Sequence, residues 1–211
     1  MIKKIGAIHK PGAAERTTSM VRHFDLVLSL GPNCRAKHQL ARIYGEAVSP
    51  SAVFDWQITP RRALHAYLRN RFRGMFEYED LTIKDGMVHA GRGANHMHAF
   101  PADITMETLP AHYGEARSRH EYLAEKTLRM FLGKQKLLLC LAVPVSLYDH
   151  VRLWAVIRRN YPRLKFMLLN GPRGDLPADS EHWKGDDAVW DRHLKSFLPR
   201  PPSLSPAPAS P

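Results

Sequence analysis

The spacing of hydrophobic and polar residues changes several times along the chain. Short apolar runs predict strands at residues 24–30, 51–56, 136–143 and 165–170. Helical periodicity fills the intervals and predicts helices at residues 33–44, 59–72, 115–133, 147–160 and 186–198. Asp85-Gly86 is a strong turn dipeptide, so it predicts a β-hairpin. The stretch "HMHAF" (96–100) is expected to extend the sheet of this hairpin. Interleaved strands and helices are typical of an α/β or α+β domain.

The two ends of the chain differ in composition from its middle. Residues 1–22 show no regular pattern, so we expect a flexible lead-in. Residues 199–211 are rich in Pro, Ser and Ala and have little to bury, which predicts a disordered tail. Residues 23–198 then form a single domain, long enough to bury a substantial core.

Composition narrows the class of protein further. The chain is 44% hydrophobic and 24% charged, as in globular proteins. No apolar stretch reaches the ~18 residues of a membrane span, and no secretory signal follows the N-terminal lysines, so we expect a cytoplasmic location. The net charge of +11 suits nucleic acid, an anionic membrane or an acidic partner. No nucleic-acid-binding or nucleotide-binding motif is present, so we expect neither specific nucleic-acid binding nor a cofactor.

Two cysteines are too few for a secreted disulfide scaffold, and they occupy different settings. Cys140 lies inside an apolar run, where a cysteine is an inert buried thiol. Cys34 follows Gly31-Pro32-Asn33, where Asn33 can cap the helix that follows. Backbone N–H groups and the dipole at a helix start stabilise a thiolate, which predicts a lowered thiol pKa and an oxyanion hole in this loop. The alternative is a buried cysteine that merely starts a helix.

A nucleophilic cysteine needs a base, and twelve histidines are available. In "ANHMHAFPAD", an extended backbone would place His96 and His98 on one face. The same H-x-H spacing is found in metal sites, where His89 or His112 could be a third ligand. No carboxylate stands nearby at a diagnostic spacing, so we predict no metal ligands.

Asp55 stands between two aromatic residues in "FDW", at the end of a predicted strand. One interpretation is an aspartate that caps the turn before Thr59. The other is a carboxylate that orients the imidazole of a catalytic histidine.

These motifs together resemble a bacterial family of unknown function catalogued as papain-like cysteine peptidases. The family shows S-L-G-x-x-C between a strand and a helix, then F-D-W, then a histidine followed by an aromatic residue. Here the motifs are Ser29 to Cys34, Phe54 to Trp56, and His98-Ala99-Phe100. The resemblance covers roughly residues 24–170. Ala99 departs from the family, which often has an acidic residue there.

The resemblance implies a single α+β domain with a papain-like cysteine peptidase or transglutaminase-type fold. It makes Cys34 the nucleophile and His98 the base, with Gly31 and Asn33 in the nucleophile loop. The third group of papain-like sites often follows the histidine, so Asn170 and Asp103 stand beside Asp55 as candidates for it.

The expected function is therefore hydrolysis or acyl transfer on an amide, peptide or thioester. The basic charge would suit an acidic carrier protein or peptide as partner. Two alternatives remain, a non-catalytic binding module on the same fold and a metal-dependent hydrolase that uses His96 and His98.

Overall fold

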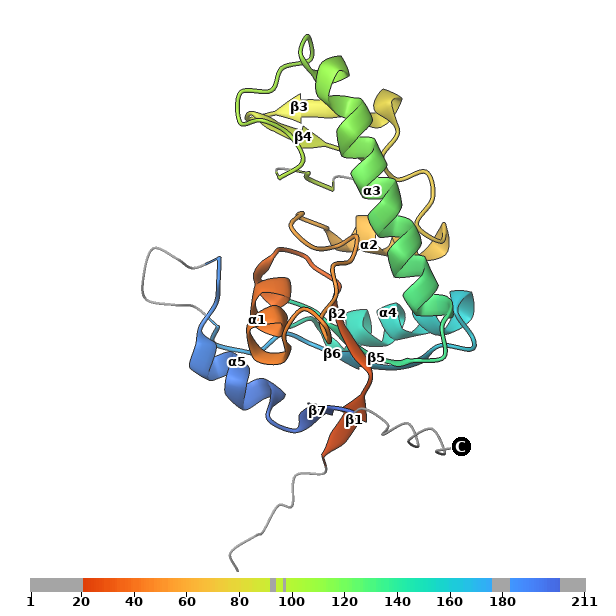
Figure 1. Ribbon diagram of the computed structural model, residues 1–211, viewed down its shortest axis with the longest axis vertical. Helices are drawn as coiled ribbons and strands as arrows, with labels where there is room; N and C mark the ends of the chain where they lie inside the picture. The colour runs from red at the N-terminus through yellow and green to blue at the C-terminus, as the bar shows by residue number, and fades with distance from the viewer. Residues whose placement is uncertain (1–20, 92–93, 97, 176–182, 202–211) are drawn as a thin grey trace, which may run out of the picture.

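The computed structural model describes residues 21–91, 94–96, 98–175 and 183–201. Most of the predicted lead-in (1–20) and of the predicted tail (202–211) lies outside this range. The described part is a mixed α+β structure (Figure 1). None of its helices is both long and apolar enough to cross a membrane.

A parallel sheet of three strands forms the centre of the structure. Its strands are β2 (Leu26–Ser29), β5 (Lys136–Cys140) and β6 (Lys165–Leu169), in the order β2-β5-β6. All three were predicted from apolar runs, which are typical of a parallel strand covered on both faces. Because all three strands run in the same direction, the loops after them gather at one edge of the sheet.

Helices cover both faces of this sheet, because successive strand residues point to opposite sides. Leu137 and Leu139 belong to a core cluster with α2 (Arg61–Arg69), α4 (Leu147–Asn160) and the end of α3 (Leu109–Leu132). Leu138 and Cys140 belong to a second cluster with α1 (Arg35–Tyr44) and α5 (Asp187–Leu194). Both layers are visible in Figure 1.

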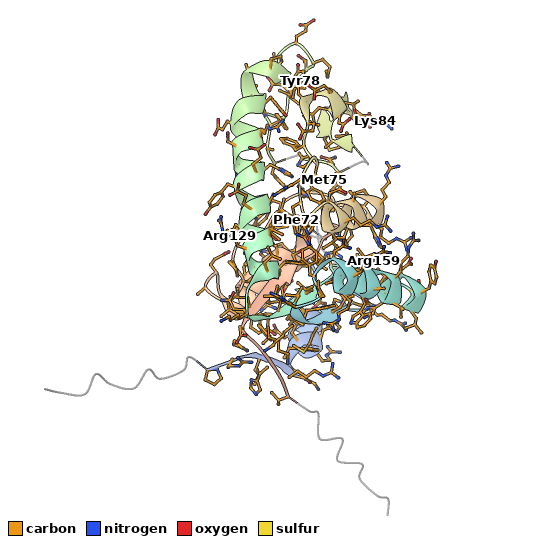
Figure 2. The ribbon with its side chains drawn as sticks, turned by 90° about the vertical axis from the view of Figure 1, so that its right-hand side faces the viewer. Phe72, Met75, Tyr78, Lys84, Arg129 and Arg159 are labelled. Carbon is orange, nitrogen blue, oxygen red and sulfur yellow. The ribbon has the colours of Figure 1, made fainter. Side chains whose placement is uncertain are left out.

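A smaller unit extends from the sheet along α3. The predicted hairpin forms from β3 (Thr82–Lys84) and β4 (Met87–His89), after a 3-10 turn, η1 (Tyr78–Asp80). Both turn residues, Asp85 and Gly86, have positive φ, as this turn requires. A third apolar cluster joins the hairpin to the start of α3. Figure 2 shows Phe72, Met75 and Tyr78 alongside α3, on the segment that connects α2 to the hairpin.

Two short elements correct the predicted boundaries. Residues 51–56 form turns and not a strand, because the Asp55 carboxylate accepts a hydrogen bond from Ala52 N (2.9 Å) and reverses the chain. The last helix ends at Leu194, and β7 (Phe197–Pro199) then pairs in parallel with β1 (Arg22–Phe24). Such short strands depend on a partner far away in the sequence, so no local pattern reveals them.

Candidate functional site

Three segments carry the motifs of the sequence: the nucleophile loop (31–34), the Phe-Asp-Trp segment (54–59) and the histidine segment (94–96 and 98). The structure places them side by side. Thr59 N donates to Pro32 O (2.8 Å), which joins the first two segments. Ile58 and Asn95 exchange two main-chain hydrogen bonds (3.0 and 2.9 Å), which join the second and third. Ile58 and Thr59 are adjacent, and successive residues of an extended segment point their N–H groups in opposite directions. Since Ile58 bonds the histidine segment and Thr59 bonds the nucleophile loop, the Phe-Asp-Trp segment lies between the other two.

Cys34 is half-buried and occupies the N-cap position of α1. The predicted cap is present one residue earlier, where Asn33 Oδ1 accepts a hydrogen bond from Arg35 N (3.2 Å). The prediction of a lowered thiol pKa is wrong. Burial raises the pKa of Cys34, and the opposing effects of its own backbone N–H and of the Arg35 charge are smaller. Cys34 is therefore a neutral thiol at pH 7, and it needs a base to become a nucleophile.

Gly31 fixes the shape of the nucleophile loop. Its φ of +77° favours glycine, and a Cβ there would lie 3.2 Å from Thr59 Cβ. Its N–H donates to Ser29 Oγ (3.2 Å), and its carbonyl accepts from Ala142 N (2.7 Å). Both main-chain groups of Gly31 are thus engaged, so oxyanion donors in this loop have to come from the start of α1.

His98 is exposed and lies against an aromatic side chain of the Phe-Asp-Trp segment. The ring of Trp56 meets that of His98 edge to face, with centroids 6.1 Å apart. Trp56 also contacts Trp183 (6.5 Å), which contacts His38 of α1 (5.1 Å). This aromatic row connects the helix of Cys34 to the proposed base. Within the described residues, the Cys34 thiol makes no hydrogen bond to a histidine.

Asp55 is buried and holds the Phe-Asp-Trp segment to α1. Its Oδ2 atom accepts from Ala52 N and lies 3.9 Å from Lys37 Nζ, while Lys37 also donates to Glu46 (2.8 Å). Burial raises the pKa of Asp55 to about 7, although the Ala52 hydrogen bond and the Lys37 charge lower it. The other oxygen, Oδ1, has no hydrogen-bond partner among the described residues. These contacts favour the interpretation of Asp55 as a turn-forming residue.

A small cavity of about 60 Å³ lies next to the Phe-Asp-Trp segment, and Asp55, His96, His98 and His120 all contribute to its lining. His96 is buried, and its Nε2 atom has no partner among the described residues. Burial, helped by nearby histidines, lowers its pKa to about 3. His120 bonds the Tyr67 hydroxyl through Nε2 (2.7 Å), and burial lowers its pKa to about 4. His96 and His120 are therefore neutral imidazoles at pH 7.

Neither of the other candidates for the third group, Asn170 and Asp103, makes a hydrogen bond to His98 within the described residues. Asn170 directly follows β6. Its Oδ1 atom hydrogen-bonds His150 Nδ1 (2.9 Å), and its Nδ2 donates to Val145 O (3.2 Å). It therefore orients His150 and makes no hydrogen bond to His98. Asp103 is exposed in the loop before α3.

The metal alternative depends on His96 and His98, which both line the small cavity but differ in exposure. Met97, between them, lies outside the described residues. Across the described ranges, no three His, Cys, Asp or Glu side chains are grouped closely enough to hold a metal ion.

Sequence reasoning missed three residues of this region. His38 stands one helical turn after Cys34, a spacing that the sequence already displays. Lys37 is the buried partner of Asp55, and His120 reaches the cavity from α3. Nothing in the local pattern distinguishes these two from surface residues of an amphipathic helix.

No protein-family model matches the chain, and no match was found among curated proteins or solved structures. The resemblance to papain-like cysteine peptidases is thus carried by the three motifs alone.

Proposed function

We propose that the protein performs cysteine-dependent acyl chemistry, as a hydrolase or acyltransferase with a papain-like pairing of nucleophile and base. One observation carries the proposal: main-chain hydrogen bonds hold the nucleophile loop and the histidine segment on opposite sides of the Phe-Asp-Trp segment. These three segments are far apart in the sequence, and they are the ones that bear the motifs.

In the proposed reaction, Cys34 Sγ attacks the carbonyl carbon of an amide, peptide or thioester, and its proton passes to His98. The bond from that carbon to the leaving nitrogen or sulfur breaks, and the leaving group takes the proton from the imidazolium. Water or an acceptor amine then attacks the thioester carbon. Its proton passes to His98, and from there to the departing Sγ.

Each neighbouring side chain has a part in this scheme. N–H groups at the start of α1 stabilise the negative charge on the carbonyl oxygen. Trp56 supports the ring of His98 from the side. Asp55 acts as a positioning residue, since the hydrogen bond that it accepts from Ala52 N and its ion pair with Lys37 fix the turn that presents Trp56. An acidic carrier protein or peptide stays the expected substrate class, because the chain carries a net charge of +11.

The test uses p-nitrophenyl acetate as acyl donor, with nitrophenolate release and intact mass as readouts. We expect a burst of nitrophenolate and one acetyl group on Cys34. The Cys140→Ala variant is the matched control, because Cys140 is fully buried and its pKa is raised to about 12. Acetylation should persist in that control and disappear in Cys34→Ala.

The base is tested in the same assay. Removing a general base costs about 100-fold or more in rate, so His98→Ala should slow acylation by that factor. His112→Ala removes an exposed histidine of α3 and should leave the rate unchanged. A loss in His38→Ala, with none in His98→Ala, would move the role of base to His38.

A second candidate function is a non-catalytic binding module. It is favoured by the raised pKa of Cys34 and by the lack of a hydrogen bond from this thiol to any described histidine. An unmodified Cys34 after exposure to the ester would decide for the binding module and against the enzyme.

A further inference from the structure

The outer face of α4 combines exposed apolar residues with arginines. Leu147 and Tyr148 are 79% and 72% exposed, and Val151 and Trp154 on the same helix are also exposed. These four side chains point away from the sheet, because Leu153 and Ile157 form the buried face of the helix. Scattered exposed hydrophobic residues are ordinary, but four on one face of one helix form a surface patch.

The charged residues of this outer face are all positive. Arg152, Arg158 and Arg159 are exposed there. The only acidic residue of α4, Asp149, lies at its start, where it pairs with Arg61 of α2. Figure 2 draws α4 at the outside of the molecule, with the labelled Arg159 near its end. Neither Arg152 nor Arg159 makes an ion pair with another described residue.

A shallow hollow of about 580 Å³ adjoins the patch at the end of α4. Two aromatic rings, Trp154 and Phe166, lie in its lining with centroids 6.4 Å apart. Arg158 packs over the Trp154 ring, 5.9 Å from its centroid. The remaining charged residues of the lining are also cations, Lys136, Arg163 and Lys165, and no carboxylate is among them. The hollow thus has the composition of a site for anionic groups beside an apolar ridge.

We propose that the outer face of α4 docks on an anionic membrane surface. Leucine, valine, tyrosine and tryptophan at the crest of a helix suit the boundary between headgroups and acyl chains, and surrounding arginines suit anionic headgroups. The face is a convex helix, which a fluid lipid surface accommodates without a matching groove. Nucleic acid is disfavoured, because Leu147 and Val151, which offer no flat ring on which a base could stack, are exposed on this face beside Tyr148 and Trp154. This inference does not depend on the proposed acyl chemistry.

The experiment is co-sedimentation of the full chain with phosphatidylcholine vesicles, with and without phosphatidylglycerol. We expect binding only to the mixed vesicles. Each arginine near an anionic surface contributes about fivefold in partition, so Arg158→Gln/Arg159→Gln should weaken binding about 25-fold. Leu147→Ser, at an exposed position that carries no core contact, should weaken it about tenfold through lost apolar burial.

The matched control is Arg192→Gln/Lys195→Gln, which removes an exposed cation of α5 and the exposed cation that caps its end, on the opposite face of the sheet. It should bind as the wild type does. Equal loss in this control, or unchanged binding by Leu147→Ser, would overturn the proposal, because either result means attraction by net charge alone. A single-stranded oligonucleotide could displace the wild type from the vesicles and fail to bind the Arg158→Gln/Arg159→Gln variant. That result would assign the face to nucleic acid instead.

Discussion

Asp55→Asn tests the electrostatic account of the Phe-Asp-Trp segment. The side chain of Asp55 is almost completely buried, and burial raises its pKa to about 7 in the folded protein. In the unfolded chain the pKa of an aspartate is ~3.9. Asparagine has nearly the same shape and retains an oxygen for the Ala52 N–H, but it does not titrate.

The magnitude follows from the two pKa values. The folded state holds the Asp55 proton more tightly than the unfolded state does, so stability is lost as the pH rises from about 4 to about 7. A difference of roughly three pKa units corresponds to about 4 kcal/mol, because each unit contributes about 1.4 kcal/mol. The wild type should therefore lose about 4 kcal/mol relative to Asp55→Asn between pH 4 and pH 8.

The assay is urea unfolding of both proteins at pH values from 4 to 8, with the difference in unfolding free energy plotted against pH. Contributions from titrating groups that do not interact with Asp55 cancel in this difference. Asp103→Asn serves as a control for the loss of one carboxylate at the surface. A flat difference curve would refute the reasoning. A curve of opposite slope would mean that Lys37 outweighs burial and holds the pKa of Asp55 down.

Four further predictions concern other parts of the structure. The pKa of His96 is about 3, below the ~6.5 of a free histidine. The unfolded chain therefore binds this proton more tightly, and the wild type should lose stability as the pH falls from 6.5 to 4. In acid unfolding, His96→Gln should lose less stability over the same pH range. Gly86→Ala, at a φ of +69°, should destabilise by about 1 kcal/mol in urea melts. Gly171→Ala should cost about 3 kcal/mol there, because its Cβ would lie 2.5 Å from the carbonyl carbon of Ala142. Iodoacetamide should alkylate Cys34 at a rate that still rises at pH 9, since burial raises the thiol pKa, and mass spectrometry can follow it.

The sequence predicts the framework of this fold well where elements are long and locally encoded. The helix at residues 147–160 has the predicted bounds, and the strands of the central sheet lie within the predicted apolar runs. The hairpin follows from its turn dipeptide. The prediction of a strand at 51–56 is wrong, because one buried carboxylate reverses the chain within a short apolar run.

The candidate site was predictable in part. Its three motifs are readable in the sequence, and their convergence is visible only in the structure, because the joining hydrogen bonds connect residues far apart in the chain. The pKa of Cys34 could not be anticipated, since the depth of burial at the helix start decides its direction. Asn170 looked free to orient His98, yet it is engaged by His150 from the start of α4.

The long helix α3 belongs to both the hairpin cluster and the core of the central sheet. Its first half packs on the hairpin cluster through Leu109 and Ala116, and its last turns pack on the sheet through Met130 and Phe131. No loop separates these two halves (Figure 1). Loss of helical structure at either end therefore removes support from the other, so heat or denaturant should melt the hairpin and the sheet together, as one cooperative unit.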